Sequence, residues 1–146
     1  MRGCAVVAVA LIAAGGCGGG DDRLSRDEYV KQADAICAKY QKRLDALPEP
    51  ENVQGLKELV DEGLPIAREG YRELKALEPP EELEADVSKW FERNDRNLEL
   101  IEELGQAAEE GDEQRIQSLA SEAEKNEEEA DRIAAGIGLD VCAEEG

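Results

Sequence analysis

Apolar residues recur every three or four positions along most of this chain, and prolines and glycines divide that pattern into four segments. This spacing places side chains on one face of an α-helix, because the helix turns once in about 3.6 residues. Pro48, Pro50, Pro79 and Pro80 mark the first two boundaries, and Gly111 marks the third. The pattern predicts amphipathic helices over residues 26–46, 53–76, 81–109 and 113–135.

Local signals support these helix boundaries. Ser25 and Glu28 have the spacing of a capping box, in which each side chain satisfies a backbone amide at the helix start. Asp112, after Gly111, can cap the last helix. Pro65 interrupts the second segment, but the apolar stripe keeps its phase across it. We therefore expect one helix kinked at Pro65, rather than two short helices.

The expected core consists of the apolar stripes of the four segments. Asn94 lies on the third stripe, where it either sets the register of packing or occupies the edge of the stripe. Of the adjacent pair Trp90 and Phe91, one ring can fill the core while the other lies near the surface. The main core candidates are Val30, Ala33, Cys37, Tyr40 and Leu44; Leu56, Leu59, Val60, Leu64, Ala67, Tyr71 and Leu74; Leu83, Val87, Leu98, Ile101, Leu104 and Ala108; and Ile116, Leu119, Ala120, Ala123, Ala130, Ile133 and Ala134.

Four amphipathic helices with short connections favour antiparallel neighbours. We therefore expect an all-α fold, a four-helix up-down-up-down antiparallel bundle with one disulfide. Its length fits one domain, over residues 25–146, after a flexible tether at residues 17–24. Strand-forming residues are sparse, which agrees with a wholly helical domain.

The composition removes several classes of function. There is no histidine, so the commonest general base and neutral metal ligand is missing. Acidic residues outnumber basic ones by 36 to 17, for a net charge of −19, which disfavours nucleic acid and permits a basic protein partner. Carboxylates are so abundant that solvated helix faces explain them best. We predict no catalytic residues, no metal site and no cofactor.

The first twenty residues have the three parts of an export signal. Arg2 gives a basic start, an uncharged apolar run covers residues 4–14, and small residues precede Cys17. The apolar run is too short to span a bilayer, which needs about 20 residues. Ala14-Gly15-Gly16-Cys17 resembles the lipobox of bacterial lipoproteins, although that family usually has Leu where Ala14 stands.

The lipobox resemblance implies that residues 1–16 form a signal peptide that is cut before Cys17, and that a lipid on this thiol anchors the chain. The expected location is then the extracytoplasmic face of the cell membrane. An ordinary secretory signal, removed nearby without lipidation, is the alternative.

Two cysteines, Cys37 and Cys142, remain once Cys17 is lipidated. An even pair in an exported chain indicates a disulfide, and two buried free thiols are the alternative. In an antiparallel bundle the end of the fourth helix returns to the start of the first, so the topology permits this bond.

A second, weaker resemblance runs through short motifs over most of the chain. Residues 33–37 (ADAIC), 77–80 (LEPP) and 138–142 (GLDVC) resemble segments of small exported helical proteins of high-GC Gram-positive bacteria. This resemblance implies export and the cysteine pairing, and it implies no biochemical activity.

Three functions stay open on this reasoning. The first is a membrane-anchored binding or structural module without enzymatic activity. The second is a carrier or sensor that holds an apolar or cationic small ligand between helices, beside Trp90 or Tyr71. The third is an enzyme that uses acidic residues alone on cell-wall glycan, which requires two carboxyl groups facing each other across a cleft.

Overall fold

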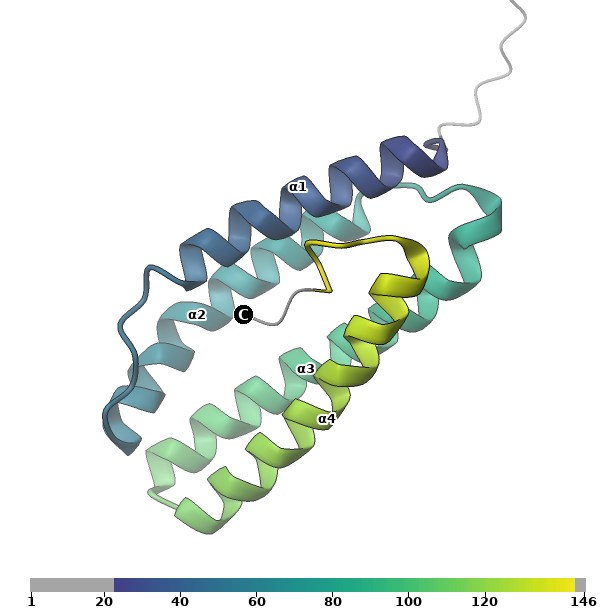
Figure 1. Ribbon diagram of the computed structural model, residues 1–146. Coiled ribbons are helices and arrows are strands. Elements are labelled where there is room, and N and C mark those ends of the chain that lie inside the picture. The colour runs from purple at the N-terminus through teal and green to yellow at the C-terminus, as the bar shows by residue number, and fades with distance from the viewer. Residues whose placement is uncertain (1–22, 144–146) are drawn as a thin grey trace, which may run out of the picture.

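Four long helices make up the bundle in the computed structural model, which describes residues 23–143 (Figure 1). No strand occurs within this part of the chain. Successive helices run in opposite directions, so the predicted up-down-up-down arrangement is confirmed. The helices are α1 (Arg26–Leu44), α2 (Val53–Lys75), α3 (Glu84–Glu110) and α4 (Glu113–Ile137), and a short 3-10 helix, η1 (Glu81–Leu83), precedes α3.

Side-chain caps fix the starts of three helices. The capping box predicted for Ser25 and Glu28 is present: each side chain accepts a hydrogen bond from the backbone N–H of the other residue. Hydrogen bonds from the Ser25 hydroxyl and from the Ser25 backbone N–H lower the pKa of the Glu28 carboxyl. Asn52 and Asp112 cap α2 and α4, where their side chains accept from the backbone N–H groups of Gly55 and Arg115. Residues next to each start in the sequence therefore determine where these three helices begin.

The observed helix ends differ from the predicted ones by a few residues. α2 is continuous through Pro65, so one helix rather than two is confirmed. The third helix does not start at residue 81 as an α-helix, because its first turn is the 3-10 helix η1. α4 continues to Ile137 because Gly138, and not Gly136, adopts the left-handed conformation, with φ of +97°. This conformation ends an α-helix and favours glycine.

The larger core cluster lies at the end of the bundle where α1 begins and α4 finishes. Tyr29 and Ala33 of α1 meet Trp90 of α3 and Ile137 of α4 there, and Leu139 of the C-terminal tail completes it. We call this the closed end. Trp90 is buried and Phe91 is half-buried, as expected for the adjacent pair.

The helix pairs with extensive packing are α1–α2, α2–α3 and α3–α4, and the α1–α4 pair is not among them. Towards its start, α4 instead packs on α3 through a second cluster of Leu100, Ala107 and Leu119. The two hairpins therefore meet tightly at the closed end, while at the other end, which we call the open end, α4 does not close onto α1.

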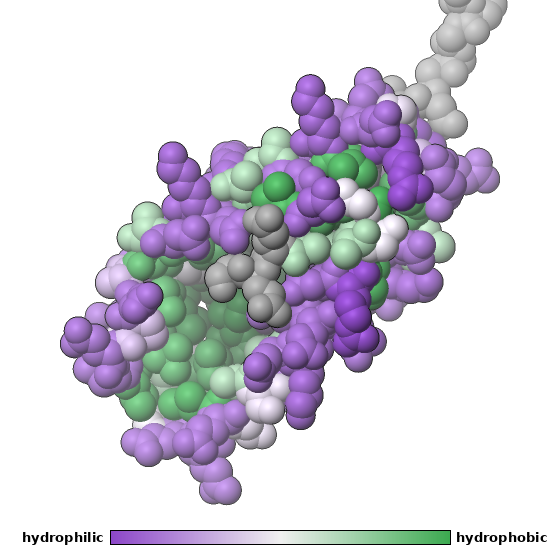
Figure 2. All heavy atoms as spheres, in the orientation of Figure 1, coloured by the Kyte–Doolittle hydropathy of each residue, from purple (hydrophilic) through white to green (hydrophobic). Residues whose placement is uncertain are grey.

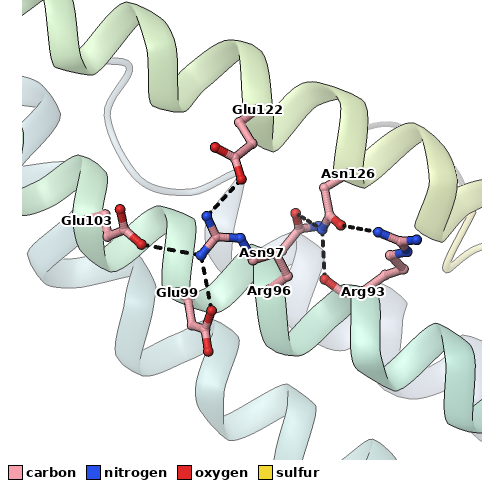
Figure 3. A network of polar contacts seen from close by, with 7 residues as sticks. All are labelled: Arg93, Arg96, Asn97, Glu99, Glu103, Glu122 and Asn126. Atoms are coloured by element: carbon pink, nitrogen blue, oxygen red, sulfur yellow. Dashed lines mark hydrogen bonds and ion pairs between the residues drawn. The ribbon is translucent and has the colours of Figure 1, made fainter.

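A polar network holds α4 on α3 between the two core clusters (Figure 3). The buried side chain of Asn126 donates to the backbone carbonyl of Arg93 at 2.8 Å and to Oδ1 of Asn97 at 2.6 Å. Arg96 pairs with Glu99, Glu103 and Glu122, and hydrogen bonds to these carboxylates raise its pKa. The network fixes the register of the α3–α4 hairpin.

The expected core was wrong at a few positions. Tyr29 is fully buried, whereas the stripe pointed to its neighbour Val30, which is half-buried. Ala120 was expected inside and is exposed. The buried polar residue is Asn126 of α4, while Asn94 is half-buried and bonds to the backbone of its own helix. In each case the neighbouring helix, rather than the stripe alone, decides burial.

Candidate functional site

The candidate site is a groove that begins where α1 lies against α2. The two helices approach closely because α2 carries glycines on the facing side. A Cβ atom on Gly70 would stand 2.7 Å from Cγ of Tyr40, which is less than two carbon atoms allow. A Cβ atom on Gly63 would meet Leu44 and Leu47 at ordinary contact distances of 3.5–3.6 Å. The ring of Tyr40 therefore fits against α2 only because position 70 is glycine.

At the open end the groove holds a cavity of about 360 Å³, which we call the distal cavity. Among the described residues Asp45 is the one charged group on its wall, and the rest of the wall is aliphatic or glycine. In Figure 2 apolar side chains form a hollow at this end of the molecule, bordered by hydrophilic side chains. The wall consists of Leu44, Asp45, Leu47, Leu56, Leu59, Val60, Gly63, Leu64, Ala67, Ile101 and Leu104.

A second cavity of about 260 Å³ adjoins the first on the side of the closed end, and we call it the proximal cavity. The two cavities share Leu44 and Ala67, and together they form what we call the groove. The proximal wall is more polar than the distal wall. It consists of Ile36, Cys37, Tyr40, Gln41, Leu44, Ala67, Gly70, Tyr71, Leu74, Glu127, Val141 and Cys142.

The distal cavity is open because no α4 residue lines it. In a closed four-helix bundle the fourth helix would cover this surface. Here the apolar residues at the start of α4, Ile116, Leu119 and Ala123, pack on α3 instead. Consequently Leu44, Leu59 and other large apolar side chains of the groove are only half-buried. An exposed apolar surface of this kind is typical of a binding site.

Ion pairs surround the proximal cavity. Nζ of Lys39 lies 2.8 Å from Oε1 of Glu73, and the hydroxyl of Tyr40 donates to the same oxygen at 2.7 Å. The hydrogen bond between Lys39 and Glu73 raises the pKa of the ammonium group and lowers the pKa of the carboxyl. Arg43 pairs with Glu69 in the same way, and this bond lowers the pKa of Glu69. These charged groups are exposed, and none of them lines either cavity.

The predicted disulfide is present and forms part of the proximal wall. Cys37 and Cys142 are bonded, with their Cα atoms 5.3 Å apart. The sequence did not reveal how the tail is held beside α1. Oδ1 of Asp34 accepts hydrogen bonds from the backbone N–H groups of Val141 and Cys142, at 3.1 and 3.2 Å. The disulfide and Asp34 together fix the tail across the gap between α4 and α1.

The two aromatic residues expected beside a ligand have different positions. Tyr71 lines the proximal cavity, and its hydroxyl donates to the backbone carbonyl of Phe91 at 2.9 Å. Burial raises the pKa of this hydroxyl, and the nearby Asp95 adds to the effect. Trp90 lines neither cavity and belongs to the core of the closed end. One of the two cavities therefore lies beside Tyr71.

The other predicted positions add no chemistry to the groove. Cys17, the predicted signal at 1–16 and most of the tether lie outside the described residues. Between residues 23 and 143 no group of three or more acidic or cysteine side chains is placed to hold a metal ion. A polar depression of about 330 Å³, lined by Glu49, Glu51, Glu58 and Glu62 among others, lies between the start of α2 and the loop before it.

Several residues of the groove were predicted as core, and that is why sequence reasoning missed the site. Leu56, Leu59, Leu64, Ile101 and Leu104 belong to apolar stripes, and a stripe does not show whether a partner helix covers it. One available signal was the small size of the opposite stripe, because Ala120 and Ala123 supply little apolar surface in the first half of α4.

No family model, curated protein or solved structure matches this chain. Within the part of the chain that the structure describes, no helix combines the length and the apolar character needed to cross a membrane.

Proposed function

We propose that this chain is an extracytoplasmic lipoprotein that binds a small apolar molecule in its groove. The observation that supports this most is the distal cavity, an open and mostly aliphatic site in a chain whose net charge is −19. Ligand sites typically have volumes of about 300–1,000 Å³ and walls that are mostly apolar. The distal cavity, of about 360 Å³, lies within this range, and the adjoining proximal cavity adds about 260 Å³. The role is that of a carrier or sensor, and the proposal involves no catalysis.

The membrane anchor is the second part of the proposal. It is supported by the lipobox-like residues before Cys17 and by the tether that follows. The described chain starts at the closed end, where the backbone N–H of Leu24 donates to the carbonyl of Glu78 at 3.0 Å. A tether that leaves from the closed end would keep the groove unobstructed.

Binding of the neutral, compact fluorophore 1-aminoanthracene tests the binding function. Residues 17–146 with Cys17→Ser, exported behind an unrelated cleavable signal, supply the protein without its own lipid. We expect its fluorescence to rise in a saturable manner, and we expect Ile101→Glu to weaken binding at least tenfold, because it places a charge on the distal wall. Ile66→Glu is the matched control, since Ile66 is also half-buried but lines neither cavity.

The proposed binding function is contradicted if the wild-type protein does not bind the fluorophore. It is also contradicted if Ile101→Glu and Ile66→Glu weaken binding equally while both proteins remain helical by circular dichroism.

Metabolic labelling with radioactive palmitate tests the anchor. In bacterial cells that make the full chain, we expect label in the protein and its recovery with the membrane fraction, because a diacyl group supplies the two chains that stable attachment needs. The Cys17→Ser variant should carry no label. An unlabelled wild-type protein in the soluble exported fraction would instead support an ordinary secretory signal.

A further inference from the structure

We infer that the ligand of the groove is a single-chain lipid whose head group carries no net negative charge. Its aliphatic chain lies in the distal cavity, and its head group lies at the proximal cavity. This inference rests on the proposed binding function and specifies the class of ligand.

The length of the groove favours a chain over a compact molecule. The two cavities follow α2 from Leu56 to Leu74 and meet at Leu44 and Ala67. At 1.5 Å per residue this stretch of helix measures about 27 Å. An acyl chain in one bilayer leaflet covers about 15 Å, half of the hydrocarbon thickness. One chain with its head group therefore matches the groove, whereas a compact molecule would occupy one cavity alone.

The polarity of the wall changes along the groove. The distal wall offers leucine, isoleucine and valine side chains from three helices, with Asp45 as its single charged member among the described residues. The proximal wall includes Gln41, Glu127 and two tyrosines, Tyr40 and Tyr71. An amphiphile with one apolar and one polar part fits this gradient, because each part then meets surroundings of its own kind.

The negative charge of the protein determines which head group the groove can accept. It also disfavours a second copy of the chain as the occupant of the groove. Glu127 lines the proximal cavity, and Asp45 lines the distal cavity. The whole chain carries a net charge of −19, so an anionic head group is repelled and a zwitterionic or cationic one is not. Two copies that covered each other's grooves would bring two such negative charges together. A single-chain lipid avoids that repulsion.

The test compares three ligands on the same Cys17→Ser protein, by calorimetric titration below the micelle concentration. They are palmitoyl lysophosphatidylcholine, which is zwitterionic, palmitate, which is anionic, and the compact 1-aminoanthracene. We expect the zwitterionic lipid to bind at least tenfold more tightly than either of the other two. The substitution Ala67→Phe fills the junction of the two cavities, so it should weaken lysolipid binding at least tenfold.

Ala85→Phe is the matched control, because Ala85 is exposed in the first turn of α3 and lines neither cavity. We expect it to bind all three ligands like the wild type. A series of lysophosphatidylcholines of increasing chain length needs no variant at all. Its affinity for the wild-type protein should rise by roughly threefold or more per methylene, as expected when each group leaves water.

The outcomes separate the inference from the proposed function. If aminoanthracene binds but the lysolipid does not, or if palmitate binds as tightly as the lysolipid, the inference is wrong and the binding function stands. An affinity that does not depend on chain length contradicts the inference in the same way. If neither the lysolipid nor aminoanthracene binds, both proposals are wrong.

Discussion

Two glycines determine how closely helices approach one another in this bundle. Gly70 accommodates the ring of Tyr40 between α1 and α2, and Gly105 accommodates Val60 between α3 and α2, where an added Cβ would stand 2.7 Å from Cγ1 of that valine. Gly63 differs, because a Cβ there would make ordinary contacts. On α2, close packing therefore requires glycine at position 70 but not at position 63.

This difference predicts opposite effects on stability for the same substitution. Gly70→Ala should lower the free energy of unfolding by about 1–2 kcal/mol, because the added methyl overpacks against Tyr40. Gly63→Ala should raise the free energy of unfolding by about 0.5–1 kcal/mol. Alanine has fewer conformations than glycine in the unfolded chain, and its methyl group fits in the folded protein. Urea denaturation measures both values. Equal shifts for the two variants would contradict the packing described for α1 and α2.

Sequence reasoning found most buried apolar residues but not the buried polar one. Asn126 interrupts the apolar stripe of α4, and nothing near it in the sequence satisfies its amide. Its partners are Arg93 and Asn97 on the preceding helix, so its burial depends on how α3 and α4 pair. The burial of Tyr29 also could not be predicted from the sequence around it. Its side chain is fully buried, although its hydroxyl has no hydrogen-bond partner among the described residues.

Among the structural elements, the C-terminal tail is the one that ties the end of α4 to α1. Leu139 fills the core of the closed end, Asp34 holds the tail backbone, and Cys142 is bonded to Cys37 of α1. The α1–α4 pair is not among the extensively packed helices, so this tail supplies much of the connection between them. The sequence predicted the bond from the cysteine count, and it predicted the helices to within a few residues.

Removal of the disulfide should destabilise the domain strongly. The bond joins cysteines 105 residues apart, and closing a loop of this length stabilises by about 4–5 kcal/mol in the chain-entropy model. The Cys37→Ala/Cys142→Ala variant should therefore unfold at a clearly lower urea concentration than the oxidised wild type. Dithiothreitol should lower the wild-type midpoint and leave the variant unchanged. A variant as stable as the wild type would show that core packing alone joins α1 to α4.

The whole molecule is closed at one end and open at the other, and this asymmetry could not be predicted from the helical stripes. The stripes predict which face of each helix is apolar, but not which helix covers it. In this bundle α4 lies on α3 and leaves the inner faces of α1 and α2 uncovered at the open end. The resulting groove is an exposed apolar surface within a largely hydrophilic exterior (Figure 2).

Isoleucine methyl NMR spectra of the protein, recorded with and without 1-aminoanthracene, test the existence of this binding site most directly. Isoleucines mark both parts of the molecule, because Ile36 and Ile101 line the groove whereas Ile133 and Ile137 belong to the core of the closed end. We predict that the ligand shifts the methyl signals of Ile101, and of Ile36 if it extends into the proximal cavity, and leaves those of Ile133 and Ile137 unchanged. Shifts confined to Ile133 and Ile137, or no shifts at saturating ligand, would contradict the assignment of the groove as the binding site.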